Sequence, residues 1–515
     1  MSRNVYVPKV VRTALTAVVP RAVRAVLSAV VPWVVLVALA VVVAGAVTEP
    51  PELGRYLAAW VLFAVALWLC RRVPARRLTV LVVVGGIGLA GIGLVAPPSS
   101  STDSFRYAWD GRVQAAGHSP YDRPPADPAL AGLRDEWLFP TDCAGAALYP
   151  LPDGGCTRIN RPTVPTIYPP LAQGYFLLIH WLSPEGARHK VLQLGGWVMA
   201  VLALLALCRI AGARRAAYWA WCPAMPIEAV NNAHVDMLGV LLVVLAFYAV
   251  RGRGALLGAA VAAKLLPATA LLGSLSGVLA GGRAGRAADA AADRAANPVA
   301  WRRVAGVVVP AGVVVVLSYL PYVLASGPAV AGYLPGYLQE ERYDGGGSRY
   351  AVLRLLLPDA WAPYAAVLLL ALVVLAVLRH GHPDRPWRGA LLVSGSLLLL
   401  FTPGYSWYAL LVVALAAMDG RWEWLGVALA GAVAYVTAPG GSGTLATVFY
   451  AGAALAVLIG WAVRRPIERT EHTERTSPAA APGHRQGAGA RQGQDPADSA
   501  AAPGRGRRRG PRLPP

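Results

Sequence analysis

The sequence predicts an all-α integral membrane protein, a polytopic bundle of about 10–13 transmembrane helices with a long first extracytoplasmic loop. Of its 515 residues, 56% are hydrophobic and only 14% are charged, whereas a soluble chain of this length covers its surface with many more charges. Apolar runs close to the length that spans about 30 Å of hydrocarbon recur along the chain. The clearest of these runs are 30–47, 57–69, 78–95, 191–207, 304–320, 365–378 and 444–463.

The distribution of the net charge of +20 predicts the orientation in the membrane. The first 24 residues carry five basic residues and no acid, and the tail from Arg464 has eleven arginines against five acids. Loop 97–166 instead has six arginines against eight acids. Cytoplasmic segments are enriched in Lys and Arg, so both ends are expected inside, the loop outside, and the number of crossings even. This asymmetry argues against a nucleic-acid partner and for a multi-pass protein of the plasma (cell) membrane.

Two stretches do not fit as plain spans. Counting 168–181 as a crossing would put the arginines between 209 and 215 outside, so we expect a re-entrant or interfacial segment there. The apolar run 254–280 is interrupted by Lys264 and Pro267 and is followed by arginines, which a broken pair of half-helices accommodates. Such irregular backbone is tolerated at membrane depth where it lines a polar cavity.

These patterns divide the chain into seven segments. They are a cytoplasmic basic amphipathic N-terminus (1–29), three N-terminal spans (30–96), an extracytoplasmic catalytic loop (97–166), a membrane core with re-entrant segments (167–280), a cytoplasmic linker (281–303), C-terminal spans (304–463) and a disordered cytoplasmic tail (464–515).

The outward loop opens with two carboxylates and two guanidinium groups. Asp103 directly follows a span, and Asp110 comes seven residues later, which on a helix places both on one face, about two turns apart. Arg106 lies on the same side, and Arg112 follows. A carboxylate at a membrane edge can deprotonate an acceptor hydroxyl while arginine holds a phosphate leaving group. The alternative is an ordinary solvated helix face with an ion pair between Asp103 and Arg106.

The loop ends in a stiff segment with an aromatic rim. Four prolines within the nine residues 162–170 exclude a helix. Tyr168 lies at the rim of this entry to the membrane and is a candidate for substrate binding. The alternative is a rigid connector with an interfacial tyrosine anchor.

Two further polar sites interrupt the apolar segments. Asn232, His234 and Asp236 lie between two hydrophobic stretches, where ionisable residues are costly and usually functional, so we expect them to bind substrate. Lys264, one of only three lysines in the chain, is expected to meet an anion such as a lipid phosphate. The alternatives are an exposed turn for the first site and snorkelling to the membrane surface for Lys264.

The cysteines suggest a disulfide and no metal site. Cys143 and Cys156 share the outward loop, where an oxidising compartment permits a disulfide between them. The spacing of the cysteines does not match that of metal ligands, and we expect neither a metal nor a cofactor.

Taken together, the motifs resemble those of the bacterial integral-membrane glycosyltransferases of the GT-C type, especially the polyprenyl-phosphate-mannose-dependent mannosyltransferases of glycosyltransferase family 87. The matching motifs are Asp103-Ser-Phe-Arg-Tyr-Ala-Trp-Asp-Gly-Arg112, Gly117-His-Ser-Pro-Tyr121, Thr166-Ile-Tyr-Pro-Pro-Leu-Ala-Gln173, Ala233-His-Val-Asp236 and Ala263-Lys-Leu-Leu-Pro267. One departure is Ala233, where members of the family often have glycine before His-Val-Asp.

The resemblance implies an outward-facing active site and an inverting transfer from a β-linked lipid phosphosugar. It implies a catalytic aspartate in the first large outward loop, which matches Asp103, with Asp110 as the reserve. Arg106, Arg112 or Lys264 would neutralise the departing phosphate. The expected partners are a polyprenyl-phosphate sugar donor, a glycan or glycolipid acceptor, and membrane lipids.

Two other classes explain part of the pattern. A polytopic transporter or lipid-linked-sugar flippase accounts for the spans, the broken helices and Lys264. It predicts inverted repeats, which the sequence does not show, and leaves loop 97–166 without a role. A scaffold protein accounts for the basic tail but for none of the polar clusters.

Overall fold

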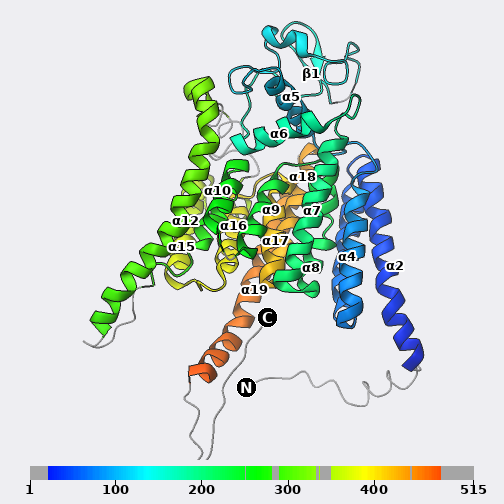
Figure 1. Ribbon diagram of the computed structural model, residues 1–515. Coiled ribbons are helices and arrows are strands. Elements are labelled where there is room, and N and C mark those ends of the chain that lie inside the picture. The colour runs from blue at the N-terminus through cyan, green and yellow to red at the C-terminus, as the bar shows by residue number, and fades with distance from the viewer. Residues whose placement is uncertain are drawn as a thin grey trace, which may run out of the picture. The chain divides into compact units, whose positions relative to one another are not determined.

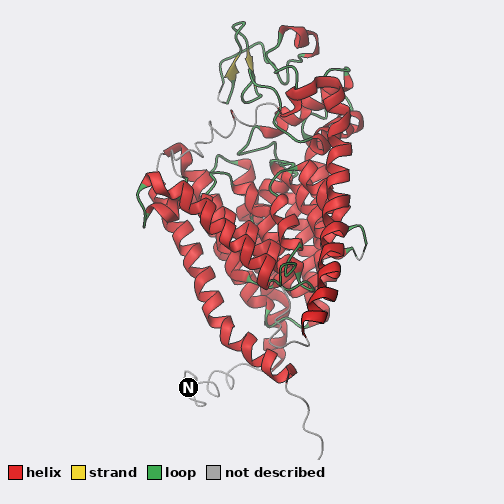
Figure 2. Ribbon diagram, turned by 90° about the vertical axis from the view of Figure 1, so that its left-hand side faces the viewer, coloured by secondary structure: helices red, strands yellow, loops and turns green. Residues whose placement is uncertain are grey.

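The computed structural model describes residues 21–145, 147–249, 251–280, 289–331, 336, 349–440 and 443–476. These residues are mainly helical, and their strands are confined to one short hairpin of β1 (Tyr149–Pro150) and β2 (Cys156–Thr157) (Figures 1 and 2). The prediction of an all-α membrane protein is therefore confirmed. The chain divides into a unit of residues 1–462, which holds the candidate site, and a unit of residues 463–515. Of the second unit, residues 463–476 are described and continue helix α19.

Within the described ranges, seven segments are long and apolar enough to cross a membrane. They lie in α2 (Arg21–Thr48), α3 (Leu53–Cys70), α4 (Ala75–Ile92), α7 (Lys190–Ala211), α12 (Asp289–Ser326), α15 (Ala362–His380) and α19 (Gly443–Thr476). An eighth span is formed if the bent pair η2 (Met225–Asn231) and α9 (Asp236–Tyr248) counts as one.

The expected count of 10–13 spans is reached only if shorter apolar helices cross as well. These are α10 (Arg253–Ala263), α16 (Pro386–Phe401), α17 (Ala409–Asp419) with the turn η5 (Ser406–Tyr408), and α18 (Leu425–Thr437) with the turn η6 (Trp422–Trp424). Helix α17 is buried along 409–418, and an apolar helix buried on all sides belongs to the bundle interior rather than to the lipid boundary.

The remaining helices are short. They are α5 (Asp103–Ala115), η1 (Pro128–Leu133), α6 (Pro170–Leu182), α8 (Ala213–Ala220), α11 (Ala268–Ser274), η3 (Gly327–Ala331), α14 (Ala351–Arg354), η4 (Asp359–Trp361) and η7 (Ala438–Gly440).

Helix α6 lies at one end of the bundle together with α5 (Figure 1). It has 13 residues, which gives about 20 Å of helix and is too short to cross the hydrocarbon. Lys190 Nζ at the start of α7 donates to the carbonyl of Leu94 just beyond α4, at 2.9 Å. Gly111 allows α5 to lie against α6, because a Cβ there would come within 2.4 Å of the Phe176 carbonyl oxygen.

The arginine-rich turns lie together at the other end. Arg214 Nη2, in α8, donates to the carbonyl of Val73, in the turn between α3 and α4, at 3.5 Å. The arginines near 209–215 therefore share an end with those of 71–77, as expected for one cytoplasmic face.

The run 254–280 forms two half-helices that meet at a break. Helix α10 ends at Ala263, Lys264 is extended with φ −158° and ψ 147°, and α11 begins after Pro267. Helix α10 packs closely on α12, because a Cβ on Gly258 would come within 2.4 Å of the Ala311 carbonyl oxygen. Small residues permit such close approach of membrane helices.

Two of the expected boundaries need correction. The segment 281–303 is not a linker throughout, because α12 begins at Asp289 and its first turns are rich in alanine, the strongest helix former. The expected disordered tail 464–515 begins as helix, since α19 continues to Thr476. Residues 1–20, 281–288, 337–348 and 477–515, which include most of the basic N-terminus and of the tail, lie outside the described ranges.

Segment 97–166, which is predicted to face outward and is called the outward segment below, has its own small core and a disulfide. Trp109, Leu138 and Ile159 are among the side chains buried in this core. Cys143 and Cys156 form a disulfide with a Cα–Cα distance of 5.8 Å. Because Cys156 pairs with Pro150 in the hairpin, the disulfide ties β1 and β2 to the preceding loop.

We predict that a cysteine introduced at Glu185, between α6 and α7, reacts with an impermeant thiol reagent from outside the cell. A cysteine at Ala213 should react only after the membrane is opened. Both are placed in a chain whose free cysteines 70, 208 and 222 are replaced by alanine. Labelling of position 213 in intact cells would contradict this orientation.

Candidate active site

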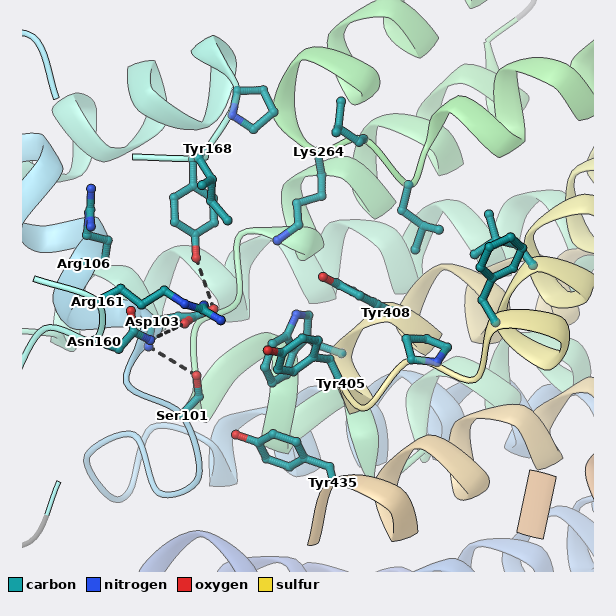
Figure 3. A pocket seen from close by; sticks show the side chains of 18 of the residues that line it. Ser101, Asp103, Arg106, Asn160, Arg161, Tyr168, Lys264, Tyr405, Tyr408 and Tyr435 are labelled. Carbon is teal, nitrogen blue, oxygen red and sulfur yellow. Dashed lines mark hydrogen bonds between the residues drawn. The ribbon is translucent and has the colours of Figure 1, made fainter. Parts of the chain in front are cut away.

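A cavity of about 950 Å³ opens where the ends of several helices meet (Figure 3). Its wall combines the start of α5, the proline-rich segment, the α10–α11 break, the start of α15, the turn after α16, and α18. Its polar lining includes Ser101, Thr102, Asp103, Arg106, Tyr149, Asn160, Arg161, Tyr168, Lys264, Tyr405, Tyr408 and Tyr435. Its apolar lining includes Leu265, Leu266, Pro363, Val367, Leu397 and Phe401. Mostly apolar lining with a few convergent polar groups is typical of a binding site.

Asp103 is the first residue of α5, and its carboxylate is held by three donors. The Tyr168 hydroxyl donates to Oδ2 at 3.2 Å, and Asn160 Nδ2 donates to Oδ1 at 3.2 Å. The Tyr107 hydroxyl, one turn along the helix, donates at 3.4 Å. The side chain keeps 16% of its surface exposed, so the carboxylate remains accessible from the cavity.

His234 lies between two carboxylates. Its Nδ1 is 3.6 Å from Asp103 Oδ2 and its Nε2 is 3.4 Å from Glu228 Oε2. The imidazole is fully buried and stacks on Trp407 with ring centroids 3.8 Å apart. Glu228 in turn accepts from the Ser406 hydroxyl at 2.5 Å. This series links Asp103 to the interior of the bundle.

The surroundings of Asp103 stabilise its charged form. Burial raises the pKa of this carboxyl, but the neighbouring His234, Lys264 and Asn160 outweigh burial and bring the pKa of Asp103 to about 2. Opposite charge and hydrogen bonds to the ionised form both have this effect. Asp103 is therefore a carboxylate at any physiological pH.

Lys264 enters the cavity from the break between α10 and α11 (Figure 3). Its Nζ forms an ion pair with Asp236 Oδ2 at 2.9 Å and lies 5.1 Å from the centre of the Tyr168 ring and 5.8 Å from that of Tyr408. The carboxylate and the two aromatic faces hold the ammonium at the wall, so Lys264 faces the cavity.

Arg106 and Asp110 form a buried pair, not a solvated face. Arg106 Nε donates to Asp110 Oδ1 at 2.8 Å, and its Nη1 donates to the Val164 carbonyl at 3.0 Å. The alternative of a solvated face with an ion pair between Asp103 and Arg106 is thus wrong, because burial of α5 against the proline-rich segment favours the i,i+4 partner. Asp110 is absent from the cavity lining. The side chain of Arg106 points away from Asp103 and Lys264 (Figure 3).

Arg112 and Asn232 also lie outside the cavity lining. Arg112 Nη2 donates to Asp135 at 2.7 Å, on the outward segment. Asn232 donates to the Ser100 hydroxyl at 2.7 Å and accepts from the Ser100 amide at 3.2 Å. Asn232 thus fixes the loop that precedes Asp103, and the assignments of Arg112 to a phosphate and of Asn232 to substrate remain predictions.

Two polar residues of the cavity wall and one behind His234 were not among the site residues predicted from the sequence. Arg161 lines the cavity and extends toward its centre beside Asp103 (Figure 3). Tyr149 lines it from β1, and Glu228 lies behind His234. The one available signal was the acidic side chain of Glu228 in an otherwise apolar run. Among the described residues, no group of three or more His, Cys, Asp or Glu side chains could hold a metal ion.

The fold and this site define the class: a polytopic membrane protein with a carboxylate-bearing cavity at one end of its bundle. Residues 166–403 match the model of Glycosyltransferase family 87, which confirms the resemblance and supports a membrane glycosyltransferase. The match includes Tyr168, His234, Asp236 and Lys264 and begins after Asp103. No curated protein and no solved structure matches the chain.

The backbone conformation at Ala233 explains why glycine suits this position. Ala233 has φ +54°, the left-handed region, which costs a residue with a Cβ roughly 1 kcal/mol or more and costs glycine nothing. The turn at Ala233 separates two neighbouring side chains. Asn232 contacts Ser100, and His234, two residues later, lies against Asp103.

We predict that Ala233→Gly raises the free energy of unfolding by roughly 1 kcal/mol, measured by denaturant titration of the purified protein in detergent. Ala229→Gly, at a helical position four residues earlier, should lower it. Equal destabilisation by both substitutions would show that the left-handed strain at Ala233 is negligible.

Proposed function

We propose that the protein transfers a hexose, with mannose as the first choice, from a polyprenyl-phosphate sugar to a lipid-linked or cell-envelope glycan acceptor. The reaction would take place at the outer face of the plasma membrane. The observation that carries this proposal is the ionised Asp103 in the wall of a cavity that also holds Lys264 and an apolar lining. The family match supports the transferase chemistry.

In the proposed reaction, Asp103 acts as the general base. An acceptor hydroxyl oxygen forms the new bond to the anomeric carbon while the bond from that carbon to the phosphate oxygen breaks. The hydroxyl proton passes to Asp103, and the electron pair leaves with the lipid phosphate. Attack opposite to the leaving group inverts the anomeric carbon.

A weakly basic carboxylate suits this step. The transition state of glycosyl transfer resembles an oxocarbenium ion, and phosphate departs without needing a proton from an acid. The base therefore has to accept a proton late, from a hydroxyl that has become acidic. What matters is that Asp103 is ionised, and its pKa of about 2 ensures this.

Lys264 is the proposed partner of the departing phosphate, and Arg161 is a second cation in the same cavity wall. Asp236 holds the Lys264 ammonium at 2.9 Å, which fixes its position before the donor binds. A preoriented cation stabilises the developing phosphate charge without reorganisation. His234 and Tyr168 orient Asp103, and the Tyr168 ring adds an apolar face to the cavity.

An apolar groove supports a lipid donor. It has a volume of about 380 Å³ and shares Val367 and Phe401 with the cavity. Its other lining residues lie on one face of α15, namely Leu370, Ala371, Val374, Leu375 and Leu378. From Val367 to Leu378 this face extends about 16 Å, room for part of a prenyl chain whose phosphate lies in the cavity.

A transporter or flippase remains the second candidate by class. The observation that favours transfer is that Asp103, Lys264 and Arg161 line one cavity at one end of the bundle. A flippase would need charged groups along a path toward the opposite end, where α17 is buried and apolar along 409–418.

We predict that Asp103→Asn abolishes transfer, because the amide keeps the shape but cannot accept the proton. Purified protein is assayed with a polyprenyl-phosphate sugar and an envelope glycolipid fraction. Glu136→Gln is the matched control, since Glu136 is an exposed carboxylate on the same segment, outside the cavity. Asp110→Asn should retain measurable transfer. Loss in Asp110→Asn but not in Asp103→Asn would move the base to Asp110.

We predict that Ala371→Trp, which fills the groove, raises the KM for a long-chain polyprenyl donor on the order of tenfold because buried apolar area is lost. The KM for a short-chain donor should stay unchanged. Leu372→Trp is the matched control, because Leu372 is 52% exposed on the same helix and outside the groove. Equal effects of Ala371→Trp on both donors would place the prenyl chain elsewhere.

A further inference from the structure

A chain of hydrogen bonds leads from α12, outside the cavity, to the buried pair of Asp110 and Arg106. The Tyr322 hydroxyl donates to Gln114 Oε1 at 2.7 Å, and Gln114 Nε2 donates to Gln173 Oε1 at 2.8 Å. Gln173 Nε2 donates to Asp110 Oδ2 at 2.9 Å, and Arg106 Nε donates to Asp110 Oδ1 at 2.8 Å. This series of hydrogen bonds joins α12, α5 and α6.

The series of hydrogen bonds ends on the proline-rich segment, which forms a wall of the cavity. Arg106 Nη1 donates to the Val164 carbonyl at 3.0 Å, and Gln173 Nε2 also donates to the Thr166 hydroxyl at 2.8 Å. Gln173 and Asp110 are buried. Buried hydrogen bonds are strong, and loss of one partner leaves another group unpaired at a cost.

A second arm starts from the ring of the same tyrosine. The Tyr322 ring packs on Tyr121 edge to face, with centroids 5.3 Å apart. The Tyr121 hydroxyl donates to the backbone carbonyl of Tyr168 at 2.6 Å. Tyr168 then donates to Asp103 at 3.2 Å. The hydroxyl and the ring of Tyr322 thus act on the same short segment, 164–168.

Helix α12 packs closely on α10, but most of its surface is exposed. Only 6% of its membrane span is buried. Its outer end is joined to the outward segment by Tyr322 and by Ser326, whose hydroxyl lies 2.6 Å from that of Ser119. Tyr322 thus connects a largely exposed helix to a buried hydrogen-bond network.

We propose that Tyr322 is a positioning residue, which sets the orientation of the Tyr168 hydroxyl on Asp103 through its two arms. This inference rests on the proposed function, because Asp103 is the base of that reaction. It makes α12 part of the active-site support, although Tyr322 does not line the cavity.

The test is a double-mutant cycle on transfer kinetics. Tyr322→Phe removes the hydroxyl arm and keeps the ring, and we expect kcat to fall roughly three- to tenfold with an unchanged KM for the donor. Tyr322→Leu removes both arms and should lower kcat further. In a Tyr168→Phe background both substitutions should have no additional effect, since contacting residues that act in series are not additive.

Tyr319→Phe is the matched control, one turn earlier on α12, and should leave kcat unchanged. A drop in kcat for Tyr319→Phe equal to that for Tyr322→Phe would indicate general damage to the helix. Tyr322 effects that multiply with that of Tyr168→Phe would overturn the inference and leave the glycosyltransferase assignment intact. Absence of any transfer by the unmodified protein would instead overturn the proposed function.

Hydrogen exchange tests the positioning without an activity. The amide of Thr166 donates to the Pro120 carbonyl at 3.1 Å, and that of Tyr168 donates to the Thr166 hydroxyl at 3.3 Å. Exchange in a peptide covering 162–170 should accelerate several-fold in Tyr322→Leu and not in Tyr319→Phe. Unchanged exchange in Tyr322→Leu would show that α12 does not hold this segment.

Discussion

The imidazole of His234 lies between the carboxylates of Asp103 and Glu228, and three distant parts of the chain meet at this contact. Asp103 begins the outward segment, His234 and Glu228 come from the bent pair η2 and α9, and Trp407 covers the ring from the turn after α16. Two carboxylates in a buried place are tolerable only if a cation or donors compensate them. The contact of His234 with Asp103 and Glu228 therefore joins the outward segment to the helical core, and the cavity lies beside that contact.

Much of this arrangement could be predicted from the sequence, for identifiable reasons. Hydropathy and the placement of arginines predict an all-α membrane protein with an outward segment 97–166. The broken run at Lys264 was predictable because a lysine and a proline interrupt an apolar stretch. Asp103 was identifiable as the candidate because it directly follows a span and begins a motif with several arginines.

The missed features depend on tertiary contacts. Arg106 lies three residues from Asp103 and four from Asp110, and both spacings allow an ion pair on a helix. The buried contacts of Arg106 with the Val164 carbonyl and of Asp110 with Gln173 favour Asp110. Arg161 directly precedes the proline-rich segment. This part of the chain is neither helix nor strand, so the sequence pattern does not predict which way its side chains point. Hydropathy also does not distinguish lipid-facing helices from an apolar helix such as α17, which is buried in the protein, so it predicts a range of crossings and not one number.

The hairpin of β1 and β2 has a consequence for how the protein matures. Tyr149 lines the cavity from β1, and β1 is held by Cys156 of β2, whose sulfur is bonded to that of Cys143. The two thiols remain reduced in the cytosol and pair only in an oxidising compartment. On the proposed orientation, this wall of the cavity is completed only after the segment has been translocated and oxidised, so the proposed catalyst becomes competent on the side where it would meet its substrates.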